Sequence, residues 1–183
     1  MIPFAFVTQS TGKLIEVERI LGQKLDHEPL DLPEIQSVKV EDVVDFKVRK
    51  AFTELRKPVM IEDTGLYIEA WNDLPGALIK WFVQRVEDKG ICRMMKDYQN
   101  RRAVAQTVVA TFDGYGEPVT FVGEVEGTIA LAPAGEGGFG WDRIFVPAGA
   151  TRTFGEMHGE EKDTYSMRCK AFKRMLSHYS NGG

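Results

Sequence analysis

The sequence has few cysteines, no excess of basic residues and no long apolar run. Its 183 residues include two cysteines, and 27 acidic side chains against 23 basic ones. The resulting net charge of −4 argues against non-specific nucleic-acid binding, which depends on a basic surface. No apolar run approaches the roughly 20 residues that a transmembrane helix needs. We therefore expect neither a stable nucleic-acid complex nor a membrane partner.

The cysteines and the first ten residues bear on localisation. Cys92 and Cys169 lie in segments with helical patterns, and their surroundings match neither a disulfide framework nor a zinc site. The opening MIPFAFVTQS has no basic start, and its apolar stretch is too short for a secretory signal. We predict a cytoplasmic protein with two reduced thiols.

The order of apolar patterns predicts an α/β fold, with a mixed sheet and helices packed on it. We expect a single domain over residues 1–183, because no repeat or linker interrupts the chain before the short tail SNGG. Strands are predicted at 2–7, 59–61, 66–71, 103–112, 119–131 and 143–146. Helices are predicted at 14–21, 40–55, 78–86, 90–99 and from Ser166 onward.

Two glycine motifs resemble nucleotide-binding signatures and fail on closer comparison. Gly12-Lys13 resembles half a P-loop, but Val7 stands where the first glycine belongs and Leu14 where a hydroxyl belongs. GEGGFG, residues 135–140, matches the dinucleotide fingerprint, but the short strand RIFV follows it instead of a helix. The first turn still has the polar residues and lysine of a phosphate site.

The strongest local signal is MIEDTGL, residues 60–66. Glu62 and Asp63 follow a buried apolar run, and we expect a turn after them. Carboxylates at the carboxyl end of such a strand lie where α/β sheets bind ligands. They can hold Mg²⁺ or act on water. Neighbouring strand residues point to opposite faces, so one carboxylate can face a site while the other braces it.

Other segments add parts that are weak individually. Glu34 follows a proline turn, and Lys47 and Lys80 sit on predicted helices; each is also compatible with an ordinary surface position. FGWD, residues 139–142, places aromatic side chains in a glycine-rich loop, where they can stack on a base or simply pack. Arg168 begins the last helix, where free N–H groups favour an anion or a carbonyl.

Six segments occur in the order seen in the inosine triphosphate pyrophosphatase family, also called Ham1-like, which this chain resembles over nearly its whole length. They are the opening turn, DLPEIQ, EDTGL, LPGALIKWF, GGFGWDRIFVP and SMRCKAF. The resemblance implies an elongated α/β fold of two lobes, with the active site in the cleft between them. It also implies a homodimer, Mg²⁺ dependence, and hydrolysis of ITP, dITP or XTP to the monophosphate and pyrophosphate.

The resemblance assigns roles position by position. Glu34 and Asp63 match metal ligands, and Asp63, Glu62 and Lys13 match catalytic positions. The remaining positions match the substrate site, and they are Thr8, Gln9, Ser10, Thr11, Gly12, Lys47, Thr64, Lys80, Phe139, Gly140, Trp141, Asp142, Lys162, Met167 and Arg168.

Two positions depart from the family pattern. Ser10 replaces an asparagine but keeps a hydroxyl for phosphate. Met167 replaces a histidine that recognises the base, and methionine donates no hydrogen bond. Three alternatives stay open: a related pyrophosphatase with shifted base specificity, a non-catalytic nucleotide-binding protein, and a nucleic-acid-binding module using Arg101 and Arg102.

Overall fold

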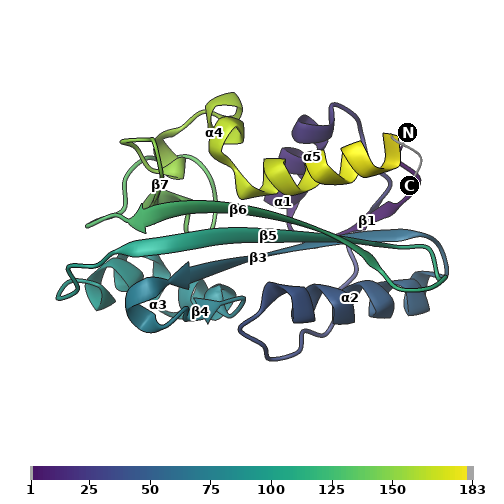
Figure 1. The fold of residues 1–183 in the computed structure, drawn as a ribbon, viewed down its shortest axis with the longest axis horizontal. Helices are drawn as coiled ribbons and strands as arrows, with labels where there is room; N and C mark the ends of the chain where they lie inside the picture. The colour runs from purple at the N-terminus through teal and green to yellow at the C-terminus, as the bar shows by residue number, and fades with distance from the viewer. Residues whose placement is uncertain (1, 181–183) are drawn as a thin grey trace.

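The structure is a computed structural model that describes residues 2–180. It contains a seven-stranded sheet flanked by helices on both faces (Figure 1). The strands are β1 (Ala5–Val7), β2 (His27–Glu28), β3 (Val59–Ile68), β4 (Pro75–Gly76), β5 (Arg102–Phe112), β6 (Val119–Ile129) and β7 (Phe145–Pro147). The helices are α1 (Thr11–Leu21), α2 (Val40–Leu55), α3 (Ile79–Met94), α4 (Gly159–Tyr165) and α5 (Met167–Ser180), with short 3₁₀ turns η1 (Glu69–Trp71), η2 (Asp142–Ile144) and η3 (Phe154–Glu156).

The sheet mixes parallel and antiparallel pairs, which confirms the predicted α/β class. The strand order is β2-β1-β3-β5-β6-β7, with β4 paired to β3. β1 runs parallel to both β2 and β3, whereas β3, β5, β6 and β7 form antiparallel pairs. The strands predicted at 103–112 and 119–131 are confirmed as β5 and β6, which pair antiparallel, with β6 ending at Ile129. A division into two lobes stays a prediction.

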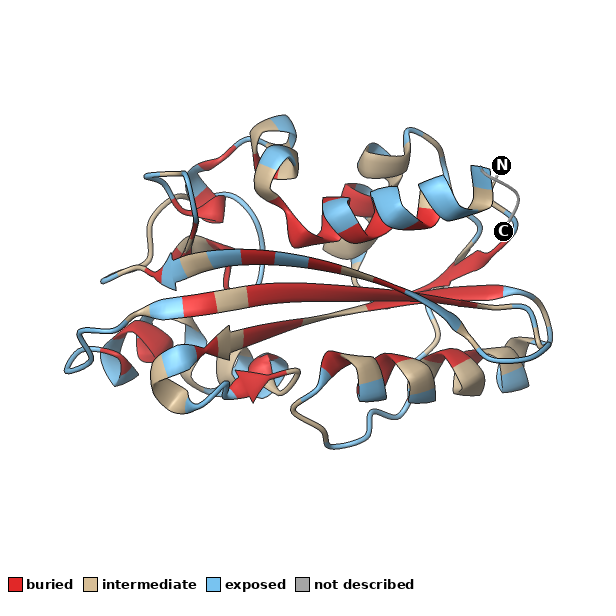
Figure 2. Cartoon of the chain, viewed as in Figure 1, coloured by how far each residue is buried: buried red, intermediate tan, exposed pale blue. Residues whose placement is uncertain are grey.

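Helices cover both faces of the sheet. α1, α4 and α5 lie on one side of the sheet and α2 lies on the other (Figure 1), whereas the buried residues of α3 pack with the end of β3 that carries Leu66 and with the start of α5. The sides of α2 and α5 that face the sheet are buried, as are the middles of the long strands (Figure 2). Alternating residues of β3 supply both cores, since Met60 packs with Phe172 of α5 and Ile61 packs with Val48 of α2.

Local signals account for the ends of several helices. Ser10 precedes α1, and its side-chain oxygen accepts a hydrogen bond from Lys13 N. Gly22 ends α1 with φ of 65°, a left-handed conformation that glycine adopts without steric cost. Ser166 precedes α5 and accepts from Cys169 N, so the predicted cap is confirmed. The predicted helix 40–55 is confirmed as α2 with the same bounds.

The turn predicted after Glu62 and Asp63 is wrong. β3 continues without a break to Ile68, pairing residue by residue with β5 from Val59↔Phe112 to Ile68↔Ala103. The two charges lie in the middle of a strand, because the pairing with β5 satisfies the backbone there. The extended segment predicted for 66–71 ends at Ile68 and becomes η1.

Smaller corrections concern residues after β3. The helices predicted at 78–86 and 90–99 join into α3, which is kinked at Glu87, where φ is 58° and ψ is 180°. The strand predicted at 143–146 begins later, at Phe145, after the turn η2. Residues 181–183 of the predicted tail lie outside the described residues.

Two further observations concern membrane-spanning helices and the two cysteines. Within residues 2–180, no helix combines the length and apolar character needed to cross a membrane. Cys92 and Cys169 are free thiols, and both are buried. Burial raises the pKa of each thiol above its usual value, so both favour the protonated form at neutral pH.

Candidate active site

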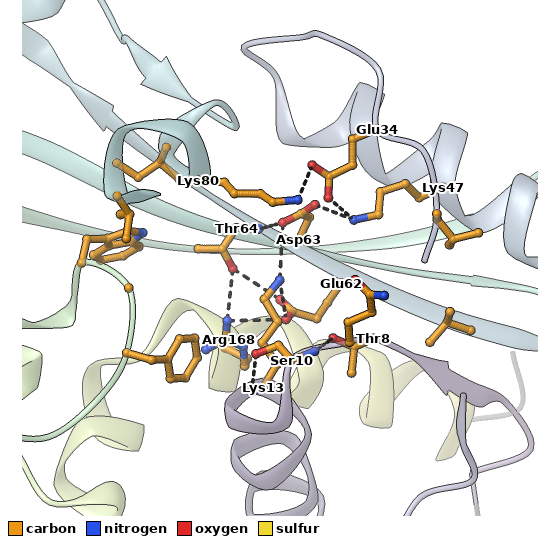
Figure 3. Close-up of a pocket in the computed structure, with 18 of the residues that line it drawn as sticks. Thr8, Ser10, Lys13, Glu34, Lys47, Glu62, Asp63, Thr64, Lys80 and Arg168 are labelled. Atoms are coloured by element: carbon orange, nitrogen blue, oxygen red, sulfur yellow. Dashed lines mark hydrogen bonds and ion pairs between the residues drawn. The ribbon is translucent and has the colours of Figure 1, made fainter. Parts of the chain in front are cut away.

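A cavity of about 440 Å³ opens beside the middle of β3 (Figure 3). Its walls come from the turn before α1, the loop before α2, the first turns of α3, the glycine-rich loop and the start of α5. The lining residues are Val7, Thr8, Gln9, Ser10, Lys13, Leu30, Asp31, Leu32, Glu34, Lys47, Glu62, Asp63, Thr64, Ile79, Lys80, Val83, Gln84, Phe139, Gly140, Trp141, Asp142, Met167 and Arg168.

The pairing of β3 explains why the cavity forms there. β1 pairs with β3 as far as Met60, and β4 begins to pair with it at Leu66. Between these two points, the described residues place no strand on this edge of β3. The gap leaves Glu62, Asp63 and Thr64 beside open space at the end of the parallel pair, where α/β sheets bind ligands.

The alternation of β3 sends its two carboxylates to opposite faces of the sheet. Glu62 follows Met60 toward α5, and its side chain is fully buried. Asp63 follows Ile61 toward α2, and its side chain is 20% exposed. Lys13 lies between the two, with its Nζ 3.1 Å from Glu62 Oε1 and 3.4 Å from Asp63 Oδ1. Glu62 is therefore the buried carboxylate of the pair and Asp63 the partly exposed one, as expected from the alternation of side chains along a strand.

Asp63 belongs to a group of charges that we call the open cluster, consisting of Glu34, Lys47, Asp63 and Lys80. Lys47 Nζ lies 3.1 Å from Asp63 Oδ2 and 2.9 Å from Glu34 Oε1. Lys80 Nζ lies 3.3 Å from Glu34 Oε2. The loop carrying Glu34, helix α2 and the start of α3 therefore meet around Asp63 (Figure 3).

Electrostatics keep Asp63 ionised. Burial alone would raise the pKa of this carboxyl, but the charges of Lys13 and Lys47 and a hydrogen bond from Thr64 N outweigh burial. The net pKa lies well below its usual range. Burial likewise opposes the charge of Lys47, yet Asp63 and Glu34 raise its pKa overall. At neutral pH Asp63 and Lys47 are therefore both charged.

The turn before α1 forms the wall below β3. Thr8 Oγ1 accepts a hydrogen bond from Ser10 N, and Ser10 Oγ caps Lys13 N, which leaves the Ser10 hydroxyl hydrogen available to a ligand. The ring of Phe139 packs on Gly12, where an added Cβ would lie 3.0 Å from the ring. Glycine at position 12 therefore lets the aromatic ring approach the start of α1 without being displaced.

The glycine-rich loop forms the other end of the cavity. Phe139 is 39% exposed, whereas Trp141 is only 7% exposed and packs edge-on against Phe145. Asp142 is buried and holds the loop, since its Oδ2 accepts from Phe139 N at 2.8 Å and from Lys162 Nζ at 2.9 Å. Of the two aromatic side chains, Phe139 offers the more accessible face to a flat ligand.

A second group, which we call the buried cluster, supports this end from behind. Its members come from five elements and are Glu16, Glu62, Asp142, Lys162 and Arg168. Arg168 Nη1 lies 2.5 Å from Glu16 Oε2, and Lys162 Nζ lies 3.1 Å from Glu16 Oε1. Burial would raise the pKa of Glu16, but Arg168 and Lys162 outweigh it and lower the pKa.

Arg168 has most of its donors engaged within the protein. Its side chain is 2% exposed, and Nη2 lies 3.5 Å from Glu62 Oε1 and 3.3 Å from Thr64 Oγ1. The guanidinium carbon stands 5.4 Å from the centre of the Phe139 ring. Nε has no hydrogen-bond partner among residues 2–180. Met167, beside it, is 1% exposed, belongs to the core beneath and is among the lining residues of the cavity.

The structure brings most of the predicted site residues together. Three predicted substrate-site residues are absent from the lining: Thr11, Gly12 and Lys162. Thr11 and Gly12 lie in the first turn of α1, with Gly12 beneath Phe139. Lys162 is 5% exposed and sits behind Phe139, 5.3 Å from its ring centre, where Glu16 and Asp142 hold it.

The sequence patterns missed several residues of the site. Glu16 falls within an ordinary helical pattern, so nothing in the sequence marks it as the centre of the buried cluster. Val83 and Gln84 follow Lys80 on α3 and line the cavity. Their spacing from Lys80, three and four residues, is the signal that places them on the same helix face.

The open cluster has a donor set suited to Mg²⁺. Among the described residues, no three acidic, histidine or cysteine side chains gather as a closed metal site. Glu34 and Asp63 both contact the ammonium group of Lys47, so the two carboxylates converge on one point. Mg²⁺ in nucleotide enzymes is commonly held by one or two carboxylates together with water and substrate phosphates. The residues present fit that arrangement.

Comparison with known proteins gives a consistent result over nearly the whole chain. The model of the Ham1 family matches residues 4–178. The dITP/XTP pyrophosphatase of Methanopyrus kandleri is 39% identical over 179 residues, covering 96% of this chain and 95% of that protein. Inosine triphosphate pyrophosphatase 1 of Trypanosoma cruzi is 39% identical over 176 residues, covering 94% and 90%.

Solved structures agree with the sequence relatives. A nucleoside-triphosphatase (dITP/XTP pyrophosphatase) of Mycobacterium abscessus matches with a TM-score of 0.72 and 32% identity, covering 94% of this chain and 98% of that one. A HAM1 protein of Coxiella burnetii shares the fold with a TM-score of 0.84 at 24% identity, over the full length of both chains. With a family match that spans residues 4–178, the chain belongs to the Ham1 family.

Proposed function

We propose that the protein hydrolyses deaminated purine nucleoside triphosphates, namely ITP, dITP and XTP, to the monophosphate and pyrophosphate. The observation that carries this proposal is that the two ends of the cavity differ in chemical character. Lys13, Lys47 and Lys80 gather around Asp63 at one end, and the ring of Phe139 is accessible at the other. A ligand with a polyanionic tail and a flat head matches both ends.

The phosphates bind at the lysine end. The ammonium groups of Lys13, Lys47 and Lys80 exchange carboxylate partners for phosphate oxygens, and the Ser10 hydroxyl donates to another. The free N–H groups at the start of α1 favour the same negative charge. Glu34 and Asp63 would hold Mg²⁺, which when bound neutralises charge on phosphate oxygens.

Hydrolysis takes place at the α-phosphorus. Asp63 accepts a hydrogen bond from the attacking water and orients it, a role that suits a carboxylate kept ionised at neutral pH. The new bond forms between the water oxygen and the α-phosphorus. The bond from that phosphorus to the bridging oxygen breaks, and pyrophosphate leaves with the lysines stabilising its charge.

The base stacks on Phe139. Arg168 and Lys162 lie behind the ring, so the loop is held by the buried cluster. The 6-carbonyl of hypoxanthine or xanthine accepts a hydrogen bond, whereas the 6-amino group of adenine donates one. A hydrogen-bond donor facing position 6 therefore selects deaminated purines, because the 6-amino group of adenine would face another donor and no hydrogen bond could form. Arg168 lines the cavity and carries an unpaired but buried Nε, and the guanidinium would have to shift to present this donor to the base.

The test is a substrate panel. The protein is incubated with Mg²⁺ and each of ITP, dITP, XTP, GTP, ATP and dUTP, and products are resolved by chromatography. Monophosphate and pyrophosphate, chiefly from ITP, dITP and XTP, are expected. Diphosphate plus phosphate would contradict the chemistry. Absence of metal-dependent turnover would instead favour a nucleotide-binding protein without catalysis.

Met167 favours one alternative within the same chemistry. It is among the residues that line the cavity, and its thioether donates no hydrogen bond, so fewer donors face the base. A pyrophosphatase with shifted base specificity would give the same products from a different set of bases. Met167→His is the variant that tests this, and a narrower substrate range in that variant would support it.

We further propose a single-domain enzyme that works as a homodimer in the cytoplasm. The dimer rests on the family resemblance, and the exposed side chains of Leu74 and Trp81 supply apolar surface for it. The two free thiols suit a reducing compartment. Sedimentation equilibrium tests the dimer directly, and a mass of about 21 kDa at micromolar concentration would contradict it.

A further inference from the structure

Gln84 is a cavity-lining amide to which neither the sequence motifs nor the proposed chemistry assign a role. It lies on the exposed side of α3 and lines the cavity together with Lys80 and Val83. The described part of the chain offers its amide no hydrogen-bond partner. Most polar groups around it are already paired, including Lys80 with Glu34 and Asp142 with Lys162. An unpaired amide facing a ligand site has hydrogen bonds to offer a ligand.

Its position along α3 relates Gln84 to the two ends of the cavity. Lys80, at the phosphate end, lies one turn earlier on the same helix face, a rise of about 6 Å. Further along the helix, Val83 and Glu87 line a neighbouring cavity of about 280 Å³ together with Phe139 and Gly140. Gln84 therefore stands between the phosphate end and the aromatic end.

An ion pair joins the second half of α3 to the turn after the glycine-rich loop, and this contact fixes the position of α3 beside the cavity. Arg143 Nη1 in η2 lies 3.5 Å from Asp88 Oδ2. The kink at Glu87 separates the turn carrying Gln84 from the segment that Asp88 anchors. The first turns of α3 thus line the cavity, whereas the later turns pack against the hydrophobic core.

We propose that the Gln84 amide binds the sugar hydroxyls of the nucleotide and so makes α3 the sugar-reading wall of the site. This inference rests on the proposed function. In a nucleoside triphosphate, the sugar lies between the α-phosphate and the base, which is the level at which Gln84 stands. A primary amide both donates and accepts, as a sugar hydroxyl does, so the two groups are complementary. Gln9, the other amide in the lining, lies beside Ser10 at the phosphate end.

The experiment compares three substrates, ITP, 2′-deoxy-ITP and 3′-deoxy-ITP, with the wild-type protein and Gln84→Ala. Loss of one hydrogen bond to a hydroxyl should raise KM for ITP by about three- to tenfold and leave kcat nearly unchanged. For at least one deoxy substrate the change should be smaller, and that substrate identifies the hydroxyl. Arg85→Ala, on the next residue of α3 but outside the lining, is the control for the helix.

Gln9→Ala is the matched contrast, because the same side chain is lost at the other end of the cavity. It should affect the three substrates equally. Equal changes for all three substrates in Gln84→Ala, or an unchanged KM for ITP, would overturn the inference. If the wild-type protein releases no pyrophosphate, the proposed function fails instead. In that case, calorimetry measures the dissociation constants of the three nucleotides for the wild-type protein and Gln84→Ala. The inference then predicts a larger loss of affinity for ITP than for at least one deoxy nucleotide.

Discussion

The buried cluster and the open cluster lie on opposite faces of the same strand and use the same kinds of charge, yet water reaches them differently. In the buried cluster, the side chains of Glu16, Glu62 and Arg168 are at most 6% exposed. In the open cluster, the side chains of Lys47 and Glu34 are 14% and 29% exposed. Adjacent residues of β3 belong to different clusters because side chains alternate along a strand.

The difference teaches which ion pairs hold the structure and which are available to a substrate. A buried charge that loses its partner has no water to replace it, so the buried cluster must stay intact. A partly exposed ammonium can exchange a carboxylate for a phosphate oxygen at little cost, because water solvates the group released. We therefore assign substrate binding to the open cluster and positioning to the buried one, apart from the donor that Arg168 can offer to the base.

The largest expected effect is on catalysis, in the open cluster. Asp63→Asn removes the charge that orients water, and turnover of ITP should fall by about a hundred- to ten-thousandfold. The melting temperature should change little, because the side chain keeps its shape. Steady-state kinetics and thermal unfolding of the same preparation measure both. A rate near that of the wild-type protein would remove Asp63 from this role.

The next effect is on stability, in the buried cluster. Glu16→Ala leaves Arg168 and Lys162 without their shared partner, and the free energy of unfolding should fall by about 3–5 kcal/mol. Urea unfolding measures it. Glu18→Gln, also on α1, is the control, because the amide oxygen can still accept from Leu25 N and only the pair with the exposed Lys24 is lost, so the midpoint should be almost unchanged. Equal effects of the two variants would erase the distinction between the clusters.

The buried cluster should also show a pH dependence with a defined sign. The folded pKa of Glu16 lies below its unfolded value, so its stabilising effect is complete above the unfolded pKa of about 4.3 and declines as pH falls. The cations that face it are Arg168 on α5, Lys162 on α4 and Arg19 on α1. The difference in unfolding free energy between wild type and Glu16→Gln should therefore shrink below about pH 4. A difference that stays constant between pH 2 and 6 would contradict this.

The smallest effect belongs to the most exposed member of the open cluster. The Lys80 side chain is 51% exposed, so Lys80→Ala should raise KM for ITP by about five- to tenfold, with little loss of stability. The effect should diminish as KCl is raised, because salt screens an exposed charge. Lys89→Ala, on the same helix and away from the cavity, should leave KM unchanged. Salt-independent KM values would argue that Lys80 does not bind phosphate.

The sequence was most informative where local rules decide structure. The spacing of valines in α2 and the glycine after α1 each have a local physical cause, and both ends of α2 and the end of α1 were predicted, whereas α1 begins at Thr11 and not at residue 14. The predicted turn after Asp63 was wrong because adjacent charges are typical of strand ends. Pairing with β5 overrides that tendency and carries the charges through the middle of a strand.

The candidate site divides in the same way. The acidic pair, the lysines and FGWD were recognisable as motifs, whereas Glu16 and Gln84 were not, because each lies in an ordinary helical pattern. The resemblance assigned Lys162 to the substrate site, and the structure places it behind Phe139, held by Glu16. The chemical character of the site was therefore present in the sequence, but the partners of each charge were not.

By itself, the sequence determined the α/β class, several helix boundaries and the acidic and basic residues around which a phosphate chemistry can be built. These follow from periodicity, capping and residue type, which act over a few neighbouring positions. Only the tertiary structure decided that β3 passes through the site and which charges are sealed on one of its faces and open on the other. Burial and pairing depend on segments far apart in the chain, such as Glu16 and Arg168, so no local pattern specifies them.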